Sequence, residues 1–157
     1  LQRAWPGTRF TWIIGRIEAR LMGLVPDIEF IAVDKRGGSR ELLRVRQAGV
    51  LSRHIHPSWV TGYVIRGAWR YLEHDWVARE GSFVYEPPGE IHTLVVDEAA
   101  GGATEMITFF NIAGAMVYVD EAGQTTGYED VFTKIEMCRR HYAEVGLGAD
   151  YVDQFVR

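Results

Sequence analysis

The chain has 157 residues and a formal net charge of -4, because 17 Lys and Arg stand against 21 Asp and Glu. This length predicts one domain with a sizeable core, and the mixed, slightly acidic charge pattern argues against nucleic acid as a partner. No run of about 18 apolar residues and no secretory signal pattern occurs, so we expect a soluble, cytoplasmic protein with no membrane partner.

Residues 28–127 alternate short runs of β-branched and aromatic residues with Gly, Pro and Asp, which is typical of an antiparallel sandwich or barrel. Residues 1–27 lack this pattern, and we expect them to form an N-terminal arm. The predicted strands are 28–34, 41–46, 50–56, 60–66, 68–73, 75–79, 82–86, 91–96, 104–110 and 115–120.

Residues 128–157 change to helical spacing after a predicted turn at 121–124. Glu129 and Asp130 suit the positive N-terminus of this helix, and Gly146 suits its C-terminal cap. We expect residues 128–157 to form a C-terminal helix and tail that pack on the barrel or on a neighbouring subunit. The apolar stripe of the helix holds Val131, Ile135, Cys138 and Tyr142.

Three histidines are candidate ligands of a divalent metal ion. His54 and His56 stand two residues apart in a predicted strand, so both side chains project from one face, with Cα atoms roughly 6.5 to 7 Å apart. His92 follows a Pro-Gly turn that leads into another predicted strand. Two imidazoles on one strand can hold a metal ion from one side only. A third imidazole from across a barrel would complete the site.

These segments resemble the paired motifs of the cupin superfamily. Gly81, Pro87, Gly89 and His92 match the second motif, in which five residues separate Gly from Pro-x-Gly and two more precede His. The first motif ends in His-x-His followed by Glu, but here the Glu position falls on Val60 or Thr61. The resemblance implies an all-β fold, the cupin double-stranded β-barrel or jelly roll, with a C-terminal α-helix.

The missing carboxylate affects the chemistry that we expect. Three neutral imidazoles leave a divalent ion its full positive charge and several open positions, which would attract an anionic, chelating substrate, whereas structural zinc normally has a fourth protein ligand. Imidazole suits iron, zinc, copper and nickel alike, so the histidines alone do not select the metal. A fourth ligand from Glu73 or His74 stays open.

Aromatic residues are frequent in the strands around the candidate site. Trp69 and Tyr71 share one face of a predicted strand and, with Tyr85, are candidate substrate-binding residues; the alternative is that they are core or interface aromatics. The sequence identifies no catalytic base, although Glu73, Glu105 or a metal-bound hydroxide would serve.

A closer likeness covers roughly Leu42 to Arg157, above all GYEDVFTKIEMCRRHYAEVGLGADYVDQFVR at 127–157. These segments resemble the 2,4'-dihydroxyacetophenone dioxygenase family of cupins. The resemblance implies a non-haem Fe(II) dioxygenase that cleaves the C–C bond of an aryl α-hydroxyketone to give 4-hydroxybenzoate and formate, using dioxygen. It also implies iron binding by His54, His56 and His92, and a homo-oligomer such as a dimer or tetramer.

Two other functions would use the same histidines. The first is a non-catalytic zinc-binding cupin that acts as a sensor or binding module, like the cupin domains of some anti-sigma factors. Metal content and an oxygen-dependent reaction separate this module from the enzyme. The second, a sugar isomerase or epimerase, would be expected to have a more basic pocket than this sequence offers.

Overall fold

The computed structural model describes residues 15–18, 27–34, 38–99 and 104–156. Its elements are β1 (Gly15–Glu18), β2 (Asp27–Asp34), β3 (Gly38–Val45), β4 (Gly49–Ile55), β5 (Val60–Arg66), β6 (Ala68–Tyr71), β7 (Ala78–Arg79), β8 (Phe83–Glu86), β9 (Ile91–Val96), β10 (Met106–Ala113), β11 (Met116–Val119), β12 (Thr125–Glu129), the helix α1 (Val131–Glu144) and the 3-10 helix η1 (Ala149–Phe155).

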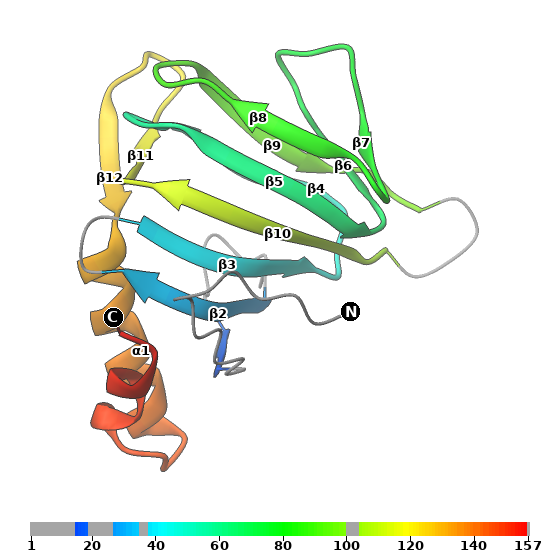
Figure 1. The fold of residues 1–157 in the computed structure, drawn as a ribbon. Coiled ribbons are helices and arrows are strands. Elements are labelled where there is room, and N and C mark those ends of the chain that lie inside the picture. Colours follow the sequence, from blue (N-terminus) through cyan, green and yellow to red (C-terminus); the bar gives the residue numbers. More distant parts are fainter. Residues whose placement is uncertain (1–14, 19–26, 35–37, 100–103, 157) are drawn as a thin grey trace, which may run out of the picture.

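The strands form two six-stranded antiparallel sheets, in the orders β1-β2-β3-β10-β5-β8 and β12-β11-β4-β9-β6-β7 (Figure 1). Neighbours in each sheet are often distant in the sequence, as in a jelly roll, where strands cross from one sheet to the other. The predicted all-β double-stranded barrel, or jelly roll, with a C-terminal helix is therefore confirmed. Within the described residues, no helix has the length and apolar character needed to cross a membrane.

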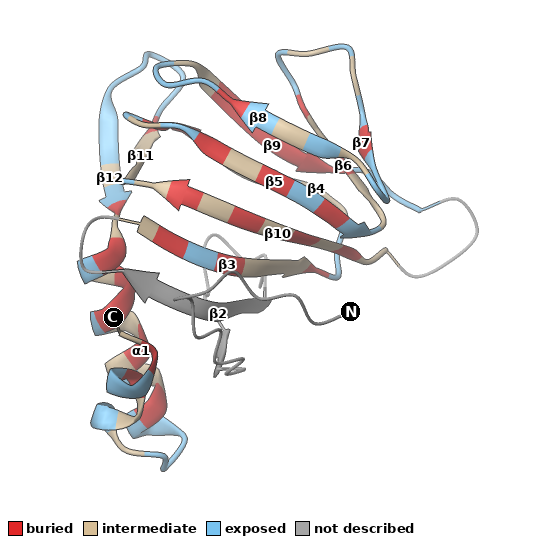
Figure 2. Cartoon of the chain, viewed as in Figure 1, coloured by how far each residue is buried: buried red, intermediate tan, exposed pale blue. Residues whose placement is uncertain are grey.

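Alternating side chains of both sheets fill the space between them. On β10 the buried and half-buried residues alternate along the whole strand, which Figure 2 shows as red and tan bands. The apolar core takes Val60, Val64 and Phe110 from one sheet and Trp69 and Leu94 from the other. Because each strand turns one face inward, residues on that face either pack in this core or line a cavity within it.

The region after residue 120 differs from the prediction in one respect. The expected turn at 121–124 is present, but the chain then forms strand β12 and pairs with β11 before the helix begins at Val131. Asp130 is the N-cap, as its position suggested, and its side chain accepts hydrogen bonds from the backbone N–H of Phe132 and Thr133. Glu129 is not part of the helix N-terminus; it is the last residue of β12 and is buried.

The stripe on α1 is covered largely by the C-terminal tail. Val131, Ile135, Cys138 and Tyr142 are buried as predicted, and Val152 and Phe155 of η1 pack against them in a small second core. Gly146 adopts a positive φ of 81° just after the helix, which is the conformation that favours glycine at a helix C-terminus. The apolar tail is thus part of the fold, because it buries the helix face that would otherwise contact water.

Candidate metal centre

Strand pairing places two of the three histidines face to face. In the antiparallel register of β4 and β9, His54 is the direct partner of His92, so their side chains leave the same face of the sheet. His56 follows the last residue of β4 and returns to that face, two residues beyond His54. Two strands therefore bring together residues that are 38 positions apart in the sequence.

The Pro-Gly turn before His92 anchors this arrangement. Gly89 has a φ of 93°, a conformation that L side chains rarely adopt, and its backbone N–H donates a hydrogen bond of 2.9 Å to the carbonyl of His56. The turn between β8 and β9 is thus tied to the end of β4. Because Gly89 is fixed by this contact, the number of residues between the turn and His92 determines where the imidazole lies.

The three imidazoles converge in the interior. The Nε2 atoms of His54 and His92 are 3.1 Å apart, and the candidate ligand atoms of all three histidines lie within 4.8 Å of one another. Each residue is at most 4% exposed. Three nitrogen atoms at this spacing match the donor set of a divalent transition metal, so these residues fit a metal ion.

Hydrogen bonds to the outer ring nitrogens orient two of the rings. Nδ1 of His56 lies 3.3 Å from the carbonyl oxygen of Ala115, so its N–H donates a hydrogen bond there and leaves the Nε2 lone pair to face inward. Nδ1 of His54 lies 3.0 Å from the hydroxyl of Ser52. The ring of His92 is held by stacking on Tyr71, with 4.0 Å between ring centroids and an interplanar angle of 6°.

Burial also sets the protonation state of the cluster. Desolvation lowers the pKa of His56 and of His92 to about 4, and it holds the pKa of His54 well below its ordinary value. Positive charge on neighbouring imidazoles lowers the pKa of His54 and His92 further. The three rings are therefore neutral at neutral pH, which is the form that binds a metal.

Glu86 is a residue of this site that the sequence reasoning missed. Its Oε2 atom lies 3.6 Å from Nε2 of His56 and 3.7 Å from Nε2 of His92, and its side chain is 4% exposed. The three histidines thus have a carboxyl group beside them, although their own motif lacks one. The alternation of side chains in the predicted strand 82–86 could have revealed it. Glu86 and Val84 point inward, while Phe83 and Tyr85 point outward.

The two oxygens of Glu86 have different surroundings. The Tyr71 hydroxyl donates a hydrogen bond of 2.7 Å to Oε1, whereas Oε2 has no hydrogen-bond partner among the described residues. Burial raises the pKa of Glu86 to about 7, and the hydrogen bond from Tyr71 acts in the opposite direction. A buried carboxyl oxygen without a partner is costly, so this atom suits contact with a bound ion, a substrate or a proton.

The structure does not bring the other acidic and histidine candidates into the cluster. Glu73 binds Arg53 and the backbone and hydroxyl of Thr93, all at 2.7 or 2.8 Å. His74 lies 3.0 Å from Glu90. Glu105 forms ion pairs with Arg44 and Arg66, with 2.7 Å to the latter. The geometry therefore favours Glu86 over each of them for a role at the metal.

Of the three aromatic candidates, Tyr71 lines the cavity described below. Trp69 is 1% exposed and belongs to the apolar core, where it contacts Phe110 and Trp76. Tyr85 is 59% exposed, because it occupies the outward phase of β8. Only Tyr71 of this group is placed to touch a molecule at the histidine cluster.

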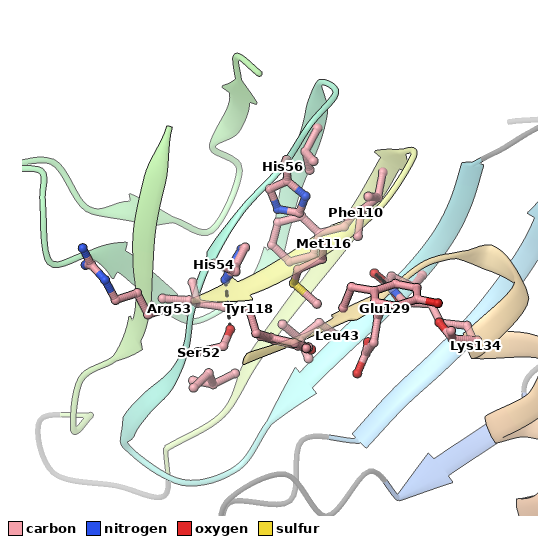
Figure 3. A pocket seen from close by; sticks show the side chains of 18 of the residues that line it. Leu43, Ser52, Arg53, His54, His56, Phe110, Met116, Tyr118, Glu129 and Lys134 are labelled. Atoms are coloured by element: carbon pink, nitrogen blue, oxygen red, sulfur yellow. Dashed lines mark hydrogen bonds and ion pairs between the residues drawn. The ribbon is translucent and has the colours of Figure 1, made fainter. Parts of the chain in front are cut away.

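A large cavity reaches the histidines from the side of the second sheet and α1. Its volume is about 1350 Å³, and His54, His56, Tyr71 and Glu86 are among the residues that line it. Figure 3 shows His54 and His56 together with Met116, Tyr118, Glu129 and Lys134 around this space. His54 and His56 are thus open to a small molecule, although they are buried from bulk water. The apolar wall includes Leu43, Leu94, Phe110, Ile112, Met116 and Val119.

Comparison with known proteins agrees with this architecture. The model of the ChrR cupin-like domain family matches residues 24–116. No curated protein matches the chain. Among solved structures, an RmlC-like cupin protein from Ralstonia eutropha JMP134 is 28% identical with a TM-score of 0.77, and the alignment covers 85% of each chain.

Two further structures share the fold at lower identity. A cupin-like protein of unknown function from Ralstonia eutropha JMP134 is 22% identical, with a TM-score of 0.76 over 92% of this chain and 91% of its own. An acetylacetone dioxygenase from Acinetobacter johnsonii is 11% identical, with a TM-score of 0.67 over 88% of this chain and 95% of its own. Because the family model covers more than half of the sequence, the chain belongs to the ChrR cupin-like domain family.

Proposed function

We propose that this protein is a non-haem Fe(II) dioxygenase that cleaves the bond between the carbonyl and hydroxymethyl carbons of an aryl α-hydroxyketone such as 2,4'-dihydroxyacetophenone. The products are 4-hydroxybenzoate and formate. Dioxygen supplies the one oxygen atom that each new carboxyl group gains, so no external reductant is needed. The observation that carries this proposal is the cavity of about 1350 Å³ that leads to His54 and His56, because a purely structural metal site needs no such access.

His54, His56 and His92 would hold the iron through their Nε2 atoms. When bound, the ion would supply Lewis-acid and oxygen-activating chemistry. The surrounding apolar side chains, among them Leu94 and Phe110, exclude water and provide a surface for the aryl ring. The fold shared with an acetylacetone dioxygenase supports this assignment by analogy, since that enzyme is also named for a ketone substrate.

Glu86 fits the role of the catalytic base, for which the sequence offered only Glu73, Glu105 or a metal-bound hydroxide. The substrate must lose a proton to bind as an enolate-like anion, and Oε2 of Glu86 is a buried acceptor without a hydrogen-bond partner among the described residues, beside the histidines. The Tyr71 hydroxyl holds Oε1 at 2.7 Å and so fixes the direction of Oε2. Tyr71 thereby positions both Glu86 and, by stacking, His92.

A second candidate function is a non-catalytic zinc-binding module, and two observations favour it. The family match is to a cupin-like domain rather than to a named enzyme. Glu86 could also serve as the fourth protein ligand, since Oε2 lies 3.6 and 3.7 Å from two of the Nε2 atoms, and a closed set of four ligands is typical of structural zinc.

Metal analysis and oxygen uptake separate the two functions. Protein purified without oxygen should contain iron and should consume one dioxygen for each 2,4'-dihydroxyacetophenone that disappears, with formate as a product. Glu86→Gln should retain the metal and lose turnover if Glu86 is the base. Tightly bound zinc, no oxygen uptake after iron loading and loss of metal in Glu86→Gln would together contradict the enzyme and support the zinc module.

A further inference from the structure

A second polar group lies in the same cavity, away from the metal ligands in the sheet. In the register of β11, Tyr118 is the partner of His54 on one side, and Met116 is the partner of Glu129 on the other. Glu129 therefore belongs to β12, two strands from β4, which corresponds to about 10 Å between the two backbones. All of these side chains line the cavity, and Figure 3 shows Met116 between His56 and Glu129.

Glu129 is a buried carboxyl group that faces this cavity. It is 8% exposed, and Tyr118, two residues along β11 from its cross-strand partner Met116, lines the cavity with it. Burial raises the pKa of Glu129, while the positive charge of Lys134 lowers it. Burying a carboxyl group costs free energy that a leucine would not, so a carboxyl group on the wall of a cavity points to a contact with a ligand.

Lys134 and Glu41 complete the cluster and hold its geometry. Nζ of Lys134 donates to both oxygens of Glu41, at 2.7 and 2.8 Å, and the two side chains are only 3% and 7% exposed. This ion pair joins α1 to β3 across the cavity wall. Because both oxygens of Glu41 are engaged by Lys134, Glu129 is the better placed of the two carboxyl groups to bind a ligand.

The cavity lining therefore combines two polar groups with apolar side chains. His54, His56 and Glu86 form one group, Glu129 of β12 lies two strands away from β4, and Leu43, Phe110 and Met116 are among the apolar residues. We propose that Glu129 is a specificity-determining residue that accepts a hydrogen bond from a hydroxyl group on the ring of the substrate. The ligand class is a phenol whose chelating group lies at the other end of the molecule.

This inference rests on the proposed function for the choice of ligand, but binding tests it without turnover. The probes are 2,4'-dihydroxyacetophenone and 2-hydroxyacetophenone, which differ only in the ring hydroxyl, titrated calorimetrically into zinc-loaded protein. Wild-type protein should bind the phenol about 10- to 100-fold more tightly, the range expected for a hydrogen bond to a charged or strongly polar acceptor. Equal affinities, or no binding of the phenol, would overturn the proposal.

The test variant is Tyr118→Phe/Glu129→Leu, which removes the carboxyl group together with the phenol hydroxyl of Tyr118, so that neither polar group is left opposite an apolar one. Its affinities for the two ketones should differ less than about threefold, through weaker binding of the phenol. The matched control is Tyr63→Phe/Glu144→Leu, which makes the same changes at exposed positions and should keep the wild-type preference. A test variant that keeps that preference would refute the role of Glu129.

Two further measurements distinguish failure of the proposed binding site from misfolding of the variant and from failure of the proposed catalytic function. If the double variant does not fold by circular dichroism, Glu129→Gln retains the shape of the side chain and should still lower the preference several-fold; an unchanged preference would overturn the proposal. Oxygen uptake by iron-loaded wild-type protein is recorded independently. A phenol preference that depends on Glu129, in a protein that consumes no oxygen, would support the binding site and contradict the proposed function.

Discussion

Val60 and Glu86 lie directly opposite each other on the neighbouring strands β5 and β8, and both are almost fully buried. Val60 is one of the two positions where the cupin motif would place its glutamate. Side chains opposite each other in an antiparallel pair have Cβ atoms roughly 5 Å apart. The carboxyl group absent from β5 is therefore supplied from β8, next to the expected place.

Val60→Glu should lower turnover because it places a second carboxyl group opposite Glu86. Two adjacent carboxylates would reduce the positive charge available to an enolate, and their repulsion would favour protonation of one of them. We expect at least a tenfold loss of kcat in the oxygen electrode, with iron still bound. Thr61→Glu is the control, since Thr61 is the partner of the exposed Tyr85 and should leave turnover nearly unchanged. Wild-type kinetics in Val60→Glu would refute the charge argument.

Glu86→Gln should separate metal binding from catalysis. The three histidines remain, so metal content should stay close to that of the wild-type protein, whereas loss of a general base costs on the order of 100- to 10,000-fold in kcat. Glu90→Gln changes a partly exposed glutamate near the same turn and should retain activity. Metal analysis and steady-state kinetics on both variants give the comparison, and full activity in Glu86→Gln would exclude it as the base.

His92→Ala should lose most of its metal and keep the β-rich fold. Removing one of three nitrogen ligands leaves only His54 and His56, while the apolar core is unchanged. Metal analysis and far-ultraviolet circular dichroism measure the two effects. His141→Ala, which removes a histidine from α1 outside the cluster, should retain stoichiometric metal. Stoichiometric metal in His92→Ala would show that the histidines are not the ligands.

Lys134→Met should be strongly destabilising, because it leaves the carboxylate of Glu41 buried without its cation. Loss of one partner from a buried ion pair costs about 3 to 5 kcal/mol in the free energy of unfolding. Urea denaturation measures this cost. Glu41→Leu/Lys134→Met should recover much of it, since neither partner of this ion pair is then left buried alone. In the exposed pair of Arg139 with Asp153, Arg139→Met should cost less than about 1 kcal/mol.

Cys138 should be inert to thiol reagents in the folded protein. It is 1% exposed, and burial raises the pKa of its thiol to about 12, so the reactive thiolate is scarce at pH 8. Reaction with Ellman's reagent should be slow in buffer and fast in concentrated urea, where the pKa returns to its ordinary value. Rapid reaction of the native protein would show that α1 and η1 do not cover this residue.

Local patterns were sufficient to predict most of the barrel. Alternating side chains, Gly and Pro turns and the spacing of His54, His56 and His92 depend on residues close in the sequence, and each of these predictions agrees with the structure. The helix stripe and the place of Asp130 at the helix N-terminus were also predicted, from periodicity and from charge. Glu129 was wrongly assigned to the helix N-terminus instead of to β12. An acidic residue favours the N-terminus of a helix whether or not a strand precedes that helix, so the charge alone did not reveal the strand.

The sequence by itself determined that strands, a Pro-Gly turn and three histidines occur in a cupin order, since those features follow from short-range chemistry. Only the tertiary structure decided which carboxyl groups face the cavity. Glu86 and Glu129 reach it because β8 pairs with β5 and β12 pairs with β11, and the phase of each strand is set by that register. Glu73 and Glu105, the candidate bases named from the sequence, are instead held by arginines.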